Sequence, residues 1–111
     1  QTVCLYGDLG TGKTTFTKGI ARGLGIGERE IMSASFIIIS EHRSKTTSAP
    51  LYHIDLYRLE NRDIDETGVY DYIGGDGVAV IEWAEKIDLE DCIKVRINML
   101  TEQSREIIIE D

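Results

Sequence analysis

A lysine and a threonine stand side by side in the segment GDLGTGKTT, residues 7–15. The order of glycine, four residues, glycine, lysine and threonine is typical of a phosphate-binding loop. Glycines let the backbone curl so that several N–H groups point at one anion. The lysine would reach the β- and γ-phosphates and the threonine hydroxyl would ligate magnesium. An ordinary glycine turn between a strand and a helix would not explain the lysine. The segment therefore predicts a nucleotide site formed by Gly7, Asp8, Leu9, Gly10, Thr11, Gly12, Lys13, Thr14 and Thr15.

Two acidic residues each follow an apolar, β-rich run. Asp55 follows LYHI and Glu82 follows VAVI. In α/β sheets, ligands gather at the carboxyl ends of the strands, and a nucleotide site needs an acid there for magnesium. We therefore expect Thr14, Asp55 and Glu82 to hold the metal, and Lys13, Asp55 and Glu82 to serve catalysis. The alternative for each acid is a solvated side chain that ends a strand.

Three of four further side chains have more than one interpretation. His53 is either a catalytic base or a half-buried packing residue with one satisfied nitrogen, and the alternating pattern of its strand favours packing. His42 stands in a polar segment and is expected to be solvated. Arg58 would clamp a phosphate or pair with an acid. Trp83 would belong to the core, shield the site or touch a partner.

The elements around these residues follow from periodicity. Residues 2–6 predict a buried strand and residues 14–24 a helix that ends at Gly25 and Gly27. Further strands are expected at 35–40, 51–57, 78–83, 93–99 and 105–110, with a loop or hairpin tip at 41–49 and partly helical structure at 63–73. The sum predicts one α/β domain over residues 1–111, a mixed sheet like that of phosphate-loop NTPases, with flanking helices and antiparallel C-terminal strands.

Composition and missing motifs disfavour several classes of function. The formal net charge is -8, from 20 acidic against 12 basic residues, so we expect no strong direct binding of nucleic acid, which usually needs a basic face. Two cysteines without metal-ligand spacing, Cys4 and Cys92, fit a cytoplasmic protein, and no apolar stretch is long enough to span a membrane. The sequence has no guanine-reading motif, and its arginines are scattered, which disfavours a GTPase and a kinase with an arginine-bearing lid.

Four segments, in order, resemble the TsaE (YjeE) family of small bacterial ATPases, which act in the pathway that makes threonylcarbamoyladenosine in tRNA. They are GDLGTGKTTF at 7–16, SASF at 33–36, YHIDLYRL at 52–59 and IEWAE at 81–85. The chain departs from the family's pattern at Ala34 and Ser35, where the family carries proline and threonine. The family also begins with a helix and a strand that this sequence lacks, so we expect upstream sequence to be missing.

The resemblance implies ATP and Mg²⁺ as cofactors and assigns roles to residues. Lys13 and Thr14 would bind phosphate and magnesium, with Asp55 and Glu82 on the metal and water side. Ser35 would take the place of a switch threonine that senses the γ-phosphate. The resemblance also implies that Trp83 supports the site, and it matches Arg105 to a family arginine without a role.

The partner implied by the resemblance is the TsaB–TsaD complex, which ATP turnover would reset between rounds of modification. Hydrolysis by the isolated chain should be slow, because no arginine is evidently placed as a finger. A nucleotide-sensing binding module and a small kinase remain alternatives.

Overall fold

The structure is a computed structural model that describes residues 1–8, 11–27, 39–44, 49–59, 64 and 67–111. Its centre is a six-stranded mixed sheet of strand order β2-β3-β4-β1-β5-β6. The strands are β1 (Thr2–Tyr6), β2 (Ile39–His42), β3 (Leu51–Asp55), β4 (Val78–Glu82), β5 (Ile93–Thr101) and β6 (Ser104–Glu110). The four central strands run parallel, and β2 and β6 each pair antiparallel at an edge. This confirms the expected mixed α/β sheet with antiparallel C-terminal strands.

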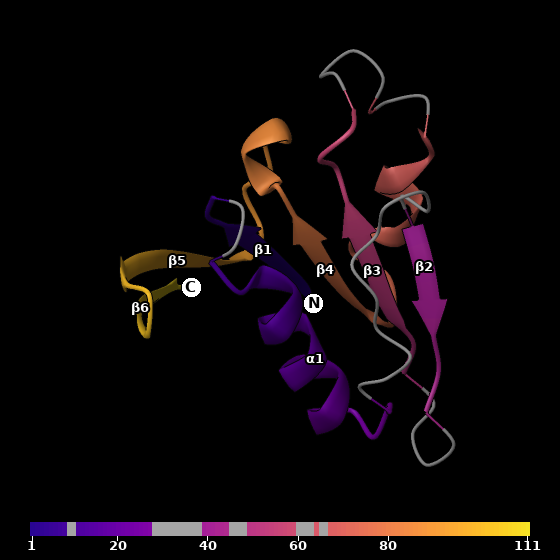
Figure 1. The fold of residues 1–111 in the computed structure, drawn as a ribbon. Helices are drawn as coiled ribbons and strands as arrows, with labels where there is room; N and C mark the ends of the chain where they lie inside the picture. The colour runs from indigo at the N-terminus through magenta and orange to yellow at the C-terminus, as the bar shows by residue number, and fades with distance from the viewer. Residues whose placement is uncertain (9–10, 28–38, 45–48, 60–63, 65–66) are drawn as a thin grey trace.

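One α-helix of the described chain, α1 (Lys13–Gly23), lies against one face of the sheet (Figure 1). Its Ala21 packs with Val3 and Leu5 of β1 and with apolar residues of β3, β4 and β5. Cys4, which lies between Val3 and Leu5 in β1, points to the opposite face, where it packs with Val69 and Ala84. Burial on both faces explains why β1 and β4 are continuous apolar runs.

The opposite face is covered by two short 3₁₀ helices among the described residues. They are η3 (Val69–Tyr72) and η4 (Ala84–Lys86), which contribute Val69 and Ala84 to the core. The prediction of partly helical structure at 63–73 is confirmed by η3 and by Ile64, which is helical, whereas residues 60–63 and 65–66 lie outside the described part.

The prediction of a polar loop from residue 41 was wrong at its start. Glu41 and His42 belong to β2, where they pair with Tyr52 and Leu51 of β3. The physical reason is that β2 is an edge strand, so ladder hydrogen bonds hold its backbone while polar side chains face outward. His42, which was expected to be solvated, is half-buried in this strand. Residues 35–38 of the predicted strand 35–40 lie outside the described part.

Other boundaries differ from the predicted ones by one or two residues. The helix begins at Lys13 and ends at Gly23, close to the predicted 14–24, and Gly25 follows with a left-handed φ of 78°. Strand β3 ends at Asp55 and β4 at Glu82. β5 continues to Thr101, and β6 starts at Ser104. No helix in the described ranges is long and apolar enough to cross a membrane.

Candidate nucleotide-binding site

The loop between β1 and α1 needs its first and last glycines for different reasons. Gly12 has a φ of 106°, a left-handed conformation that side-chain-bearing residues rarely adopt. A Cβ at Gly7 would stand 2.7 Å from the carbonyl oxygen of Ile97 and from Oγ1 of Thr11. The loop therefore passes close to β5 and turns sharply into α1. Leu9 and Gly10 lie outside the described residues.

Lys13 opens α1 and folds back over the loop. Its side chain is 6% exposed, and Nζ donates a hydrogen bond to the carbonyl oxygen of Gly7. Nζ also lies 3.6 Å from the centre of the Trp83 ring system. Burial lowers the pKa of Lys13, and nearby carboxylates, Glu85 first, act in the opposite direction. The predicted phosphate-binding lysine is thus held at the loop by a carbonyl and an aromatic face.

Thr14 and Glu82 meet at the carboxyl end of the sheet. Oγ1 of Thr14 donates a hydrogen bond of 3.2 Å to Oε1 of Glu82. Parallel register places Asp55 directly opposite Glu82 on the neighbouring strand. The structure therefore brings together the three residues predicted for magnesium. The donor set fits the ion, because Mg²⁺ prefers one or two carboxylates, a hydroxyl, and oxygens of phosphate and water.

The described ranges contain no group of three or more His, Cys, Asp and Glu side chains arranged to hold a metal. A protein-only metal cage is therefore not built by this part of the chain. For a magnesium ion at this site, the hydroxyl of Thr14 would be the third protein donor beside the two carboxylates.

Asp55 is half-buried, and Oδ1 accepts a 3.0 Å hydrogen bond from the backbone N–H of Tyr57. Burial raises the pKa of Asp55, and the hydrogen bond from Tyr57 opposes that rise. The charge of Glu82 raises it further. Two neighbouring carboxylates in a partly buried setting are a common feature of functional sites.

His53 is more deeply buried than the expected half-buried packing residue. It is 2% exposed, and its Nε2 contacts Oε2 of Glu82. The signal available in the sequence was the period of two along the strand, which puts His53 on the same face as Asp55. What the sequence did not show was that Glu82, 29 residues later, is the partner.

Trp83 follows β4 in a left-handed conformation, with a φ of 59°. This turn directs the indole toward Lys13, and the ring also packs on Tyr57 with 5.0 Å between ring centroids. Lys86 of η4 donates to the carbonyl oxygens of Tyr57 at 2.6 Å and Leu59 at 2.8 Å. Trp83 packs against the core cluster of this face and also lies over Lys13, so both the core and the shielding interpretations fit its position.

The structure shows a contact for Arg105, to which the sequence assigned no role. From β6, its Nε donates a 3.1 Å hydrogen bond to the carbonyl oxygen of Thr11 in the loop. Thr15 lies exposed on α1, and Arg58 is exposed after β3. Ser35, the expected γ-phosphate sensor, lies outside the described residues.

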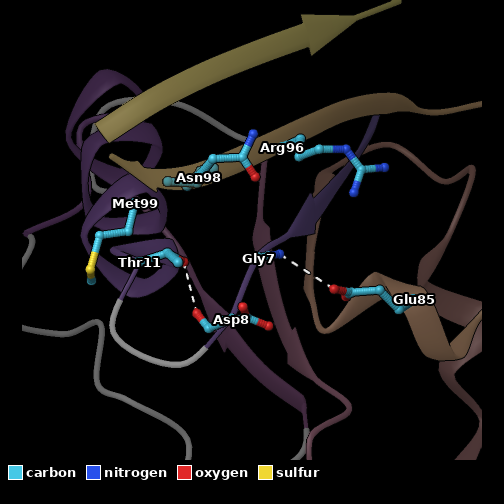
Figure 2. Close-up of a pocket in the computed structure, with 8 residues that line it drawn as sticks. Gly7, Asp8, Thr11, Glu85, Arg96, Asn98 and Met99 are labelled. Atoms are coloured by element: carbon cyan, nitrogen blue, oxygen red, sulfur yellow. Dashed lines mark hydrogen bonds between the residues drawn. The ribbon is translucent and has the colours of Figure 1, made fainter. Parts of the chain in front are cut away.

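A pocket of about 500 Å³ lies beside the loop (Figure 2). It is bounded by residues of the loop, η4 and β5, namely Gly7, Asp8, Thr11, Glu85, Arg96, Ile97, Asn98 and Met99. The backbone N–H of Gly7 donates to Glu85 at 3.4 Å, and Oγ1 of Thr11 donates to the carbonyl oxygen of Asp8 at 2.9 Å. The β5 residues were not among the predicted site residues, because the register that pairs Tyr6 with Arg96 is not readable from local patterns.

Comparisons with known proteins identify the family of the chain. The family model described as "Threonylcarbamoyl adenosine biosynthesis protein TsaE" matches residues 1–107. A protein of Bacillus subtilis with the name tRNA threonylcarbamoyladenosine biosynthesis protein TsaE is 49% identical over 84 residues, 76% of this chain and 51% of its own length. Proteins of the same name from Treponema pallidum and Synechocystis are 39% and 40% identical. They are matched over 96% and 77% of this chain and over 79% and 55% of their own lengths.

The chain thus spans between about half and four fifths of the length of these three relatives. The family match covers every element of the described structure except the last residues of β6. The loop, the two strand-end acids and the tryptophan after Glu82 all lie inside the matched range. The chain belongs to the TsaE family.

Proposed function

We propose that the chain binds ATP with Mg²⁺ and hydrolyses it in support of tRNA threonylcarbamoyladenosine biosynthesis. The observation that carries this proposal is the convergence of Thr14 and Glu82 at 3.2 Å beside the buried Lys13, on a loop between strand and helix. A loop of this kind presents backbone N–H groups and a helix N-terminus to an anion. Family membership supports the pathway.

Each residue has a task that follows from its place. Lys13 supplies the positive charge for the phosphates, and it is already confined to the loop by Gly7 and Trp83. Thr14, Glu82 and Asp55 hold the metal and orient water with oxygen donors. Mg²⁺, when bound, neutralises charge on the β- and γ-phosphate oxygens. Trp83 covers Lys13 and limits the access of water to it.

We assign the ribose and base to the pocket along β5. The pocket begins at Gly7 of the loop and extends to Asn98 and Met99, so it offers both an amide and an apolar side chain next to the phosphate site. Ligand pockets commonly combine apolar walls with a few polar groups that fix orientation.

The partner we propose is the TsaB–TsaD complex, in the cytoplasm. The formal charge of -8 supports a division of labour in which other subunits contact the tRNA, because a protein this acidic lacks the charge for phosphate neutralisation. Two other functions, nucleotide sensing without useful hydrolysis and phosphate transfer to a small acceptor, give different outcomes in the same experiment.

The experiment measures phosphate release from ATP with and without TsaB–TsaD and tRNA. We expect slow release by the chain alone and stimulation by the complex. Nucleotide binding without stimulated release would favour the sensing module, and transfer of label to a small acceptor would favour the kinase. Lys13→Ala should abolish ATP binding, whereas Lys18→Ala on the same helix should not. A fully active Lys13→Ala protein would refute the site.

A further inference from the structure

His53 and Glu82 form a buried pair beneath the candidate metal site. Both residues are at most 3% exposed, and Nε2 of His53 contacts Oε2 of Glu82. In the parallel ladder, His53 stands opposite Val80, two residues before Glu82, so both side chains lie on the face that α1 covers. A carboxylate can only accept hydrogen bonds, so the contact requires a hydrogen on Nε2.

The two oxygens of Glu82 are engaged from two different elements. The hydroxyl of Thr14 in α1 is closer to Oε1, at 3.2 Å, than to Oε2, at 3.5 Å, and Oε2 meets His53 of β3. Two contacts on separate oxygens fix the plane of a carboxylate, whereas one contact would leave it free to rotate. The contact with Thr14 is made by the hydroxyl that would ligate the metal, so the contact with His53 is the one that can persist when the metal binds.

His53 is too deeply buried to contact a nucleotide in this site directly. It lies in the middle of β3, two residues below Asp55, and its side chain is 1% exposed. The strand-end position belongs to Asp55, which stands opposite Glu82 in register. Any effect of His53 on the reaction therefore acts through Glu82.

We propose that His53 is a positioning residue that holds the Glu82 carboxylate in the orientation that couples Mg²⁺ to nucleotide binding. This inference rests on the proposed function, since it assumes that the site takes a magnesium nucleotide. It assigns to a histidine outside the metal site the task of presenting one oxygen of Glu82 to the ion. Groups that orient metal ligands in this way typically change metal affinity or activity by about 10–100-fold when they are replaced.

A matched pair of substitutions separates hydrogen bonding from packing. His53→Gln keeps an N–H donor at the same number of bonds from the backbone, and His53→Met keeps the length without a donor. ATP binding is measured by calorimetry over a series of free Mg²⁺ concentrations and in EDTA. We expect His53→Met to raise the Mg²⁺ concentration for half-maximal ATP binding by about 10–100-fold. Affinity in EDTA should be unchanged, and His53→Gln should restore most of the metal dependence.

The possible outcomes distinguish this inference from the proposed function. A wild-type chain that binds no ATP at any Mg²⁺ concentration would refute the proposed function. A normal wild type with unchanged Mg²⁺ dependence in His53→Met, or with equal loss in both variants, would refute the positioning role alone. In a Glu82→Ala background, His53→Met should have no further effect on the Mg²⁺ midpoint.

A second measurement needs no change at His53, so it remains available if His53→Met does not fold. The chain has two histidines, and His42→Gln leaves His53 as the single imidazole. Long-range ¹H–¹⁵N spectra of this variant should show a hydrogen on Nε2, and its signal should shift when Mg²⁺ is added to the ATP-bound protein. An Nε2 without a hydrogen, or a signal that does not shift when Mg²⁺ is added, would overturn the inference.

Discussion

The backbone conformation at Trp83 allows a direct test of the structure, because it should make a glycine variant more stable than an alanine variant. Trp83 is the one residue other than glycine with a positive φ among the described residues, at φ 59° and ψ 43°. We predict that Trp83→Gly is more stable than Trp83→Ala. At most positions alanine is the more stable of the two, because glycine has more conformational freedom to lose on folding.

The magnitude follows from two opposing costs. A side-chain-bearing residue in the left-handed region costs about 1–2 kcal/mol. The flexibility of glycine in the unfolded chain costs about 0.4–1 kcal/mol. Their difference favours Trp83→Gly by roughly 0.5–1 kcal/mol.

Both variants lose the same indole contacts, so these cancel between them. Against the wild type, the loss includes the interaction with Lys13 at 3.6 Å, about 0.5–2 kcal/mol. It also includes the ring contact with Tyr57 at 5.0 Å, about 0.5–1.5 kcal/mol. Both variants should therefore be clearly less stable than the wild type.

The assay is urea unfolding followed by far-ultraviolet circular dichroism, because Trp83 is the only tryptophan and its fluorescence is lost. Free energies of unfolding come from linear extrapolation at equal m-values. Lys18 in the middle of α1 supplies the control, where alanine should exceed glycine by about 0.8–1 kcal/mol. If alanine also exceeds glycine at position 83, the left-handed turn that directs the indole to Lys13 is wrong.

Three further predictions test separate parts of the site. Asp55→Asn should raise the free energy of unfolding at neutral pH, because burial raises the pKa of Asp55 and ionisation therefore weakens the folded state. This gain should vanish as the pH falls below 3.8, the usual pKa of an aspartate. Urea unfolding at a series of pH values would show both effects. Asn98→Ala should weaken binding of ATP but not of inorganic tripolyphosphate in calorimetry, since Asn98 lines the pocket that we assign to the ribose and base. Equal losses would reject this assignment. Burial raises the pKa of the Cys4 thiol to about 12, so Cys4 should resist iodoacetamide in the native protein. The half-buried Cys92 should be alkylated, and mass spectrometry of the peptides can distinguish the two cysteines.

The parts of the site that were predictable from sequence are those with local signals. The phosphate loop is defined by a pattern of consecutive residues. Gly12 lies at the turn and Lys13 at the helix start, as that pattern requires. Asp55 and Glu82 were identifiable because each ends an apolar run, and parallel pairing then brings strand ends to one edge. Local chemistry and the periodicity of strands were sufficient for these residues.

The rest depends on which strands pair and in what register. The contact of His53 with Glu82 spans 29 residues, and that of Lys13 with Trp83 spans 70. No local pattern states that β1 lies between β4 and β5, and so the pocket on β5 could not be foreseen. The end of β2 was mistaken for a loop because polar residues on an edge strand resemble loop composition.

The charges around Lys13 bear on how the nucleotide arrives. Four carboxylates act on this one ammonium group, those of Glu85, Glu82, Asp55 and Asp8. A free polyphosphate would meet more negative than positive charge here, and partial burial weakens the screening by water. A divalent cation would change this balance, because it would neutralise the charges of Glu82 and Asp55 and add positive charge where the phosphates are expected. We therefore expect the site to take ATP as its magnesium complex, with Lys13 released from Gly7 only when a phosphate replaces that carbonyl oxygen.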